Sequence, residues 1–405
     1  MLAVIPSSLM ASRPSLDSLT GVVPHSAARV LRAETKVNTQ WIGPQDAKEL
    51  SEDQLKSYEL GHNIMKHLCI SAPLLHKSGH PGGPLSAFTF CYGLLLRRDP
   101  KIDSALRLSA GHLSLLAYGL QYLGGKGAQD PRLASPEAII EAFRTPAGLP
   151  GHAEAGIGDI PFGCGPLGKG VSNALGYALG KRILGKPGVT DVLMGDGESQ
   201  EGQIMEAARM ASKLQLDTLL LHADVNDIQL SGIPSKVAAA DLASIFQSMG
   251  WAVLEVQYGN DPAQVEAALD AADALVGKGR PIFLCYYTTM GHGISLMEDA
   301  SNKESAEFHG APMKEAMAKE ELLKIPSLEV LTKEYAPFRK KLLAKAEGMP
   351  PASVPLPSPA KVQRVITKEK GAARKDFGAV HIKNLMKTDD RIIVLHGDLA
   401  GSGGF

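Results

Sequence analysis

Residues 190–226 read TDVLMGDGESQEGQIMEAARMASKLQLDTLLLHADVN, and this stretch decides the fold. The apolar run Val-Leu-Met leads into Asp196, and apolar side chains then recur with helical spacing over residues 204–214. A second apolar run, Leu-Leu-Leu, leads toward Asn226. A strand, a crossover helix and a second strand in this order predict two parallel neighbours in an α/β sheet.

The polar residues that follow these strands predict a cation site. Asn226 follows Asp196 by thirty positions (226 − 196), and both come after the carboxyl ends of the predicted strands. Mg²⁺ prefers oxygen ligands and usually takes only one or two protein side chains. We therefore expect Asp196, Asn226 and the backbone carbonyl of Ile228 to bind it. A Gly-Asp-Gly sequence by itself also fits an ordinary turn.

The rest of the chain predicts one large α/β domain and the start of a second. Strand-like runs alternate with helical patterns and Gly-rich connections, which indicates a doubly wound parallel sheet with a ligand crevice beyond the strand carboxyl ends. The expected divisions are a leader or disordered extension at 1–40, the main domain at 41–325, a Lys- and Pro-rich linker at 326–365 and a truncated second α/β domain at 366–405. In that last part, 377–386 is expected to be a helix and 391–395 a strand.

Composition limits the functional classes. The chain has 405 residues, 44% of them hydrophobic and 21% charged, which is typical of a globular protein. A formal net charge of −1 argues against a nucleic acid or an anionic membrane as partner, and no apolar run is long enough to span a bilayer. The four cysteines are widely separated, which fits free buried thiols in a reducing compartment.

Residues 1–33 differ from the rest. They contain Arg13, Arg29 and Arg32 but only one acidic residue, Asp17. This bias is typical of an organelle transit peptide. A disordered extension or a misplaced start codon explains it equally well, so the sequence predicts a cytoplasmic protein, or a plastid or mitochondrial one if this segment directs import.

Seven sequence blocks resemble the transketolase family, which uses thiamine diphosphate, and they occur in the family's order. They are Ser78-Gly-His-Pro-Gly-Gly-Pro84, Leu108-Ser-Ala-Gly-His112, Gly148-Leu-Pro-Gly-His152, Gly165-Pro-Leu-Gly-Lys-Gly170, Gly195-Asp-Gly-Glu-Ser-Gln-Glu-Gly202, Thr288-Thr-Met-Gly-His-Gly293 and Phe308-His-Gly-Ala311. The resemblance implies the thiamine diphosphate-binding fold, in which 41–325 binds the cofactor diphosphate (the PP domain) and 366–405 begins the pyrimidine-binding (PYR) domain. The implied cofactors are thiamine diphosphate and Mg²⁺, with Ca²⁺ as the other candidate ion.

The resemblance also assigns roles to single residues. The implied cofactor contacts are His112, Gly165, Leu167, Gly195, Asp196, Gly197, Asn226 and His309. His80 and His152, together with His309, would orient or deprotonate sugar hydroxyls. Histidine is suited to this work because it exchanges protons near neutral pH, although a single histidine is more often structural. The family position of His292 is commonly aromatic or lysine, so its role is open.

Further assignments concern a subunit boundary and the second domain. Glu201 matches a glutamate that supports the cofactor site across the dimer interface, although a carboxylate at a helix N-terminus needs no such role. Asp398 matches a residue near the cofactor at the subunit boundary. Arg374 and Ser402 match residues that hold the sugar phosphate, for which guanidinium and hydroxyl donors are suited.

The implied reaction transfers a two-carbon ketol unit from a ketose phosphate to an aldose phosphate, as in the pentose phosphate pathway or the Calvin cycle. The family's pyrimidine-binding glutamate has no counterpart up to Phe405. We therefore expect a fragment or one half of a split enzyme, weakly active alone, that forms a homodimer or a heteromer with a chain that supplies the remaining PYR and C-terminal domains. Two other interpretations stay open: another thiamine diphosphate enzyme, of the 2-oxo acid dehydrogenase E1 or deoxyxylulose phosphate synthase type, and a non-catalytic binding or dimerisation subunit.

Overall fold

The computed structural model describes residues 11–12, 38–125, 130–347, 378, 382–389 and 394. The chain divides into two compact units, and the first comprises residues 1–178 and 188–350. The second comprises residues 179–187 and 351–405, and of its C-terminal part the structure describes mainly one short helix, α16 (Lys383–Thr388). The predicted helix at 377–386 overlaps α16 only in part. The predicted strand at 391–395 and the rest of the truncated second domain lie outside the described residues.

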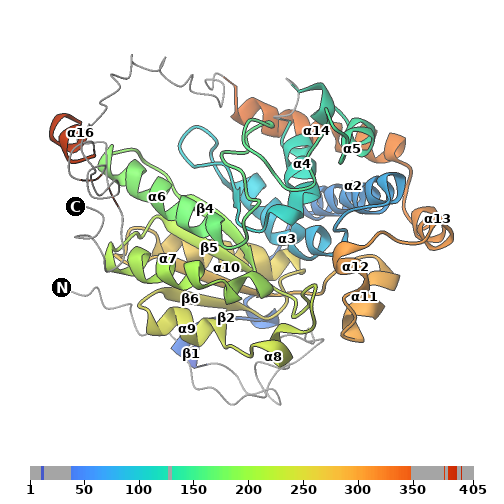
Figure 1. Cartoon of the computed structure of the whole chain (residues 1–405). Helices are drawn as coiled ribbons and strands as arrows, with labels where there is room; N and C mark the ends of the chain where they lie inside the picture. Colours follow the sequence, from blue (N-terminus) through green and yellow to red (C-terminus); the bar gives the residue numbers. More distant parts are fainter. Residues whose placement is uncertain are drawn as a thin grey trace, which may run out of the picture. The chain divides into compact units, whose positions relative to one another are not determined.

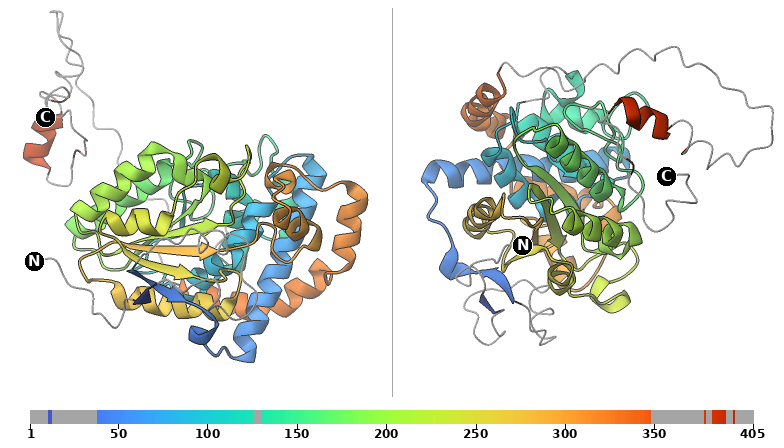
Figure 2. Two further views of the ribbon diagram at one scale, coloured as in Figure 1. Left: turned by 90° about the horizontal axis from the view of Figure 1, so that it is seen from below. Right: turned by 90° about the vertical axis from the view of Figure 1, so that its left-hand side faces the viewer.

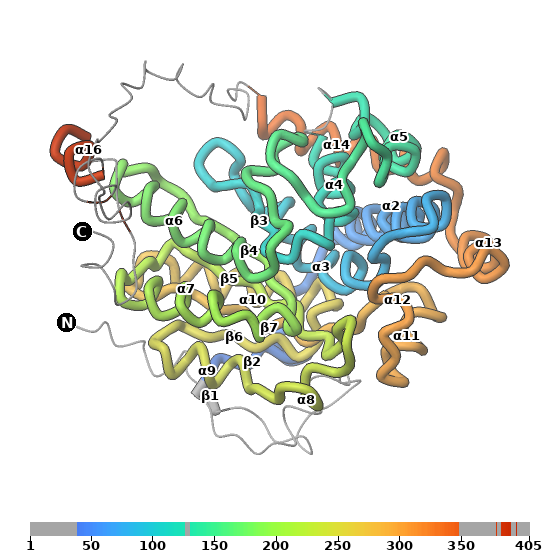
Figure 3. The backbone as a smooth tube through the Cα atoms, in the orientation of Figure 1, coloured from blue at the N-terminus to red at the C-terminus, as the bar shows by residue number. Residues whose placement is uncertain are grey.

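The first unit is built on a seven-stranded sheet (Figure 1). In sheet order its strands are β1 (Ala11–Ser12), β2 (Asn38–Ile42), β6 (Ala252–Val256), β7 (Ile282–Tyr287), β5 (Leu219–Val225), β4 (Thr190–Gly195) and β3 (Arg107–Leu108). All neighbouring pairs from β2 to β3 are parallel, and among the described strands only β1 pairs in the antiparallel sense. Strands β6, β7, β5 and β4 lie side by side in the middle of this sheet (Figure 3). The predicted parallel α/β fold is confirmed.

Helices connect and cover these strands. In chain order, the α-helices of the first unit are α2 (Glu52–His76), α3 (Gly82–Arg97), α4 (Ser114–Leu123), α5 (Pro136–Ala142), α6 (Lys169–Ile183, which continues into the second unit), α7 (Gly202–Lys213), α8 (Pro234–Val237), α9 (Leu242–Ser248), α10 (Pro262–Leu275), α11 (Ser295–Asn302), α12 (Glu307–Gly310), α13 (Glu315–Leu323) and α14 (Leu328–Lys345). Short 3₁₀ helices are η3 (Pro44–Asp46), η4 (Gly111–Leu113), η6 (Pro131–Leu133) and η7 (Gly197–Gln200). The strand–helix–strand unit predicted at 190–226 is β4, α7 and β5.

The sheet is covered on both faces, as a doubly wound fold requires (Figure 2). Phe283 and Tyr286 lie three positions apart on β7, so their side chains point to opposite faces. Phe246 of α9 stacks on Phe283 with ring centroids 4.0 Å apart, whereas Phe90 of α3 stacks on Tyr286 at 4.1 Å. Helices α9 and α3 therefore lie on opposite faces. The four cysteines are all buried and free, as predicted.

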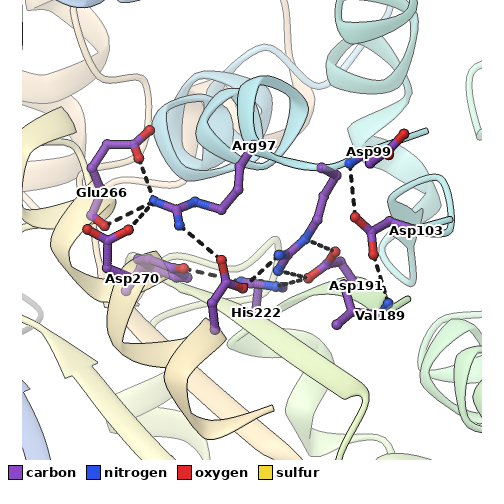
Figure 4. A network of polar contacts seen from close by, with 11 residues as sticks. Arg97, Asp99, Asp103, Val189, Asp191, His222, Glu266 and Asp270 are labelled. Carbon is purple, nitrogen blue, oxygen red and sulfur yellow. Dashed lines mark hydrogen bonds and ion pairs between the residues drawn. The ribbon is translucent and has the colours of Figure 1, made fainter. Parts of the chain in front are cut away.

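A buried ion network ties α3 to the sheet and to α10 (Figure 4). Asp191, at the start of β4, accepts hydrogen bonds from Arg98 Nε at 2.7 Å and from His222 Nε2 at 2.9 Å. Arg97 binds Glu266 and Asp270 of α10. Burial alone would raise the pKa of Asp191, but the charge of Arg98 and the hydrogen bond from His222 hold that pKa well below its usual range. The network lies at the amino end of β4, so it leaves the carboxyl edge of the sheet free for a site.

The first unit extends further than the sequence suggested. Residues 328–345, which we expected to belong to the linker, form helix α14, which packs against α2. Ser327 caps this helix by accepting a hydrogen bond from the backbone N–H of Val330. Tyr335 is fully buried on α14, and its hydroxyl lies 2.8 Å from that of Tyr92 on α3. Lysines dominate the sequence of this helix, so its narrow apolar face was not recognised from the sequence.

Candidate active site

Asp196 and Asn226 meet at the carboxyl edge of the sheet, as the sequence predicts. Strands β4 and β5 are parallel neighbours, with Gly195 paired to Asp224, so the turns that follow them lie side by side. Asp196 and Asn226 both line one cleft at this edge, together with Ile228. The cleft is the ligand crevice expected of a doubly wound sheet.

The carboxylate of Asp196 joins the two turns directly. It is only 7% exposed; its Oδ1 accepts a hydrogen bond from Gly197 N at 2.7 Å, and its Oδ2 accepts one from Asp227 N at 2.5 Å. Burial and then the negative charge of Asp224 raise the pKa of Asp196 well above its usual value. A cation would relieve this crowding of negative charge.

The amide of Asn226 is oriented by a buried carboxylate beneath it. Asp224 is 2% exposed and, when ionised, can only accept hydrogen bonds. Asn226 Nδ2 donates to Asp224 Oδ2 at 2.9 Å and to Ser86 Oγ at 3.1 Å, so Oδ1 occupies the other side of the amide. There Oδ1 accepts the N–H of Ile228 at 2.9 Å. Burial raises the pKa of Asp224 to about 6.

The donor set fits a hard cation. One carboxylate, one amide oxygen and one backbone carbonyl are oxygen ligands of the kind that Mg²⁺ and Ca²⁺ select. Within residues 38–125 and 130–347, no three or more His, Cys, Asp or Glu side chains gather in a group suited to a metal ion. If Asp196 and Asn226 hold such a cation, phosphate and water would supply the remaining ligands.

Glycines leave the backbone accessible at two points of the cleft. A Cβ added to Gly165 or Gly195 would meet no atom within 4 Å, so a phosphate can approach the main chain there. Gly197 differs, because a Cβ there would lie 2.9 Å from Gln229 Cβ. We expected Gly197 to allow close approach of the cofactor; in the structure its missing side chain makes room for Gln229.

Glu198 is a buried residue that the sequence analysis missed. Its carboxylate accepts hydrogen bonds from Ser109 Oγ, from Gly168 N at 2.8 Å and from Gly195 N at 3.2 Å. Burial raises the pKa of Glu198 to about 7 despite these donors. This one side chain ties three segments of the cleft together. Its position within the Gly-Asp-Gly-Glu turn, two residues after Asp196, was the available signal.

The four predicted histidines gather in the same cleft. The ring centroid of His80 lies 5.2 Å from that of His112, 6.1 Å from His152 and 6.0 Å from His309. His80 precedes α3, His112 lies in η4, His152 follows α5 and His309 lies in α12, so four separate segments build the cluster. Burial lowers the pKa of all four, to about 4 for His80 and about 3 for His112. They are therefore neutral near pH 7.

The other predicted residues separate into three groups. Leu167 lines the cleft and is 40% exposed. Glu201 is exposed at the start of α7, outside the cleft lining, so its role across a dimer interface stays a prediction. Arg374, Asp398 and Ser402 lie outside the described residues.

Residues 60–329 match the family described as transketolase, thiamine diphosphate binding domain. The chain belongs to the transketolase family. The matched residues include β3 to β7 and the whole described cleft, so the site of this transketolase-family chain lies within the thiamine diphosphate-binding domain. The predicted family is confirmed.

Known transketolases are similar over the same part of the chain. The transketolase of Streptococcus pyogenes is 33% identical over 275 residues, which are 63% of this chain and 36% of that protein. Transketolase 2 of Xanthobacter flavus is 34% identical over 257 residues, 58% of this chain and 35% of its own. The Pichia stipitis transketolase solved with sedoheptulose 7-phosphate aligns with a TM-score of 0.60 at 25% identity, covering 71% of this chain and 45% of its own. The chain thus spans less than half the length of these relatives.

Proposed function

We propose that the chain supplies the cofactor-diphosphate half of a transketolase, which transfers a two-carbon ketol unit from a ketose phosphate to an aldose phosphate. One observation carries the proposal. In a chain of this family, the cation-ligand pair Asp196 and Asn226 and all four predicted histidines line a single cleft. The pentose phosphate pathway and the Calvin cycle both require this reaction.

The turns after β4 and β5 would hold the cofactor diphosphate through a divalent cation. Asp196, Asn226 and the carbonyl of Ile228 are the proposed ligands for Mg²⁺, with Ca²⁺ as the alternative. His112, His309, Leu167, Gly165 and Gly195 line the same cleft and would contact the cofactor. When bound, thiamine diphosphate supplies a nucleophilic carbon and an electron sink.

The histidines would act on the sugar. His80, His152 and His309 are neutral near pH 7 and can therefore hydrogen-bond hydroxyl and carbonyl oxygens of a bound substrate. The Pichia stipitis relative binds sedoheptulose 7-phosphate, so sugar phosphates are the proposed substrates. Arg374 and Ser402 would hold the phosphate group. Since the four rings come from separate segments, the folded sheet edge supplies their alignment.

Because the chain spans less than half the length of its transketolase relatives, the proposal includes further domains that complete the site. We propose a homodimer, or a heteromer with a chain that carries the remaining PYR and C-terminal domains, in which Glu201 and Asp398 lie at the subunit boundary.

Among the described residues, no helix is both long and apolar enough to cross a membrane. We propose a cytoplasmic protein, or a plastid or mitochondrial one if residues 1–33 direct import.

A ketol-transfer assay tests the proposed function. Purified protein is incubated with thiamine diphosphate, Mg²⁺, sedoheptulose 7-phosphate and an aldose phosphate, alone and with a chain that carries the remaining transketolase domains. We expect little turnover alone, and in the mixture a new ketose phosphate two carbons longer than the acceptor, detected by mass spectrometry. A mixture that forms no product although thiamine diphosphate binds would contradict the proposal and favour a non-catalytic binding subunit.

A further inference from the structure

Arg144 lies directly behind the histidine cluster. It follows α5 in a tight turn, with a left-handed φ of 55° and its backbone N–H bonded to Leu149 O at 2.7 Å. Its guanidinium donates to Ser78 Oγ at 2.6 Å and lies 3.3 Å from His80 Nδ1, measured from Nη2. Among the described residues no carboxylate pairs with it. The titratable group that Arg144 contacts is therefore the imidazole of His80.

The backbone of the next turn packs closely against this guanidinium. A Cβ added to Gly151 would lie 2.4 Å from Arg144 Nε and 2.7 Å from its Cζ. The guanidinium thus packs against Gly151, the residue that precedes His152, and any larger residue there would force Arg144 to move. Arg144 therefore contacts both the turn that carries His80 and the turn that carries His152.

The hydrogen-bond chemistry of arginine decides the state of His80. A guanidinium only donates hydrogen bonds and keeps its charge in proteins, so His80 Nδ1 must be the acceptor. A neutral imidazole carries one proton, and with Nδ1 accepting, that proton is on Nε2. The Nε2 edge faces α12, because a Cβ added to Gly310 would lie 3.5 Å from His80 Nε2.

The surroundings keep His80 neutral. Arg144 and the rings of His112, His152 and His309 face it, and no carboxylate among the described residues pairs with it. Burial, followed by the charges of His309, Arg144 and His152, lowers its pKa to about 4. At pH 7 the ring therefore offers one N–H toward the cleft and has its only lone pair occupied by Arg144.

We propose that Arg144 is a positioning residue that holds His80 as the Nε2–H tautomer, so that His80 donates a hydrogen bond to a sugar oxygen and does not accept a proton from it. The tautomer follows from the contacts of this chain alone, whereas the sugar step rests on the proposed function. The general base is then His152 or His309. Among the described residues, no arginine donates a hydrogen bond to the ring nitrogens of these two histidines.

Nitrogen NMR of the full chain tests the tautomer without any need for activity. In ¹⁵N-histidine-labelled protein at pH 7, His80, assigned by its loss in His80→Gln, should show a protonated Nε2 and an unprotonated Nδ1. In Arg144→Met, the Nδ1 resonance should move toward the value of a nitrogen without a donor, and His80 should titrate at higher pH. Arg209→Met, at an exposed arginine of α7, is the matched control and should change neither.

An Nδ1–H tautomer in the unaltered protein overturns the proposal. A His80 resonance and a His80 titration that both stay unchanged in Arg144→Met overturn it as well.

Kinetic measurements on the assembled enzyme provide a second test. Loss of a hydrogen-bond donor in His80→Ala should lower kcat roughly 10²–10³-fold, and His80→Gln, whose amide N–H can still donate, should recover most of it. Equal losses of about 10²–10⁴-fold in both variants would identify a general base. If no ketol transfer occurs in any preparation, the proposed function fails while the NMR arm still decides the tautomer.

Discussion

Replacing Asp224 by asparagine should reverse the orientation of the side-chain amide of Asn226, a proposed metal ligand. Asp224 Oδ1 accepts hydrogen bonds from Ser86 Oγ at 2.8 Å and Thr288 Oγ1 at 2.5 Å, and the amide oxygen of the variant can keep both. Oδ2, which receives Asn226 Nδ2 at 2.9 Å, becomes an NH₂ group. Two donors would then face each other, so the Asn226 amide should flip and point its oxygen inward.

The flip removes one proposed ligand oxygen but re-forms the lost hydrogen bond. Outer-shell changes of this kind weaken metal binding by roughly 10–100-fold, which corresponds to about 1.4–2.7 kcal/mol. The flip also turns the Asn226 NH₂ group toward the N–H of Ile228, which loses its 2.9 Å hydrogen bond to Oδ1. The free energy of unfolding should therefore fall by about 1 kcal/mol, which is the net contribution of one hydrogen bond.

Electron paramagnetic resonance of free Mn²⁺, used in place of Mg²⁺ with thiamine diphosphate present, measures the affinity, and urea unfolding measures the stability. Asp217→Asn is the matched control, since Asp217 precedes the other end of β5 and accepts a hydrogen bond from Gly279 N. Unchanged Mn²⁺ affinity in Asp224→Asn would refute the idea that Asp224 orients Asn226. A fall in affinity matched by an equal loss of stability would refute it as well.

Three further predictions concern stability, each measured by urea unfolding. Asp191→Asn should cost up to about 3–5 kcal/mol, because it removes the buried carboxylate that pairs with Arg98 and leaves that guanidinium only the partly exposed Asp273. Asp270→Asn at a half-exposed pair should cost less than about 1 kcal/mol; similar losses would contradict the buried network. Tyr335→Ala should cost about 3–5 kcal/mol if α14 belongs to the first unit, and an unchanged midpoint would show that it does not. Because His80 has a folded pKa of about 4, below the unfolded value of about 6.5, the unfolded state binds more protons between these values. Stability is then fully present above about pH 6.5 and falls as the pH falls toward 4, and His80→Gln should flatten that slope; an identical slope in the variant would exclude the contribution of His80.

The elements around the cleft were predictable because their signals are local. Strands β4 and β5 are continuous apolar runs, and α7 repeats its apolar residues with helical period, so a short window contains the whole pattern. Helix α14 was missed because lysines and the internal Pro337 dominate its sequence. Its buried residues, Leu331 and Tyr335 among them, are covered by α2 and α3, which are distant in sequence. Their burial could therefore not be predicted from the sequence of α14 alone.

The site divides in the same way. Gly-rich blocks identify the turns that carry Asp196 and the histidines, because such turns need particular residues. The residues that orient them act over long sequence distances: Ser86 and Asp224 lie 138 positions apart, and Arg144 and His80 lie 64 apart. A single sequence does not connect such pairs, so Asp224 and Arg144 emerged only from the folded chain.

Calorimetric titration of the chain with thiamine diphosphate tests the central claim most directly, namely that Asp196 and Asn226 hold a divalent cation for the cofactor diphosphate. The account predicts measurable binding with Mg²⁺, loss of that binding in EDTA, and strong weakening in Asp196→Ala and Asn226→Ala. Equal affinity in Mg²⁺ and in EDTA, or unaltered Mg²⁺-dependent binding in both variants, would contradict it.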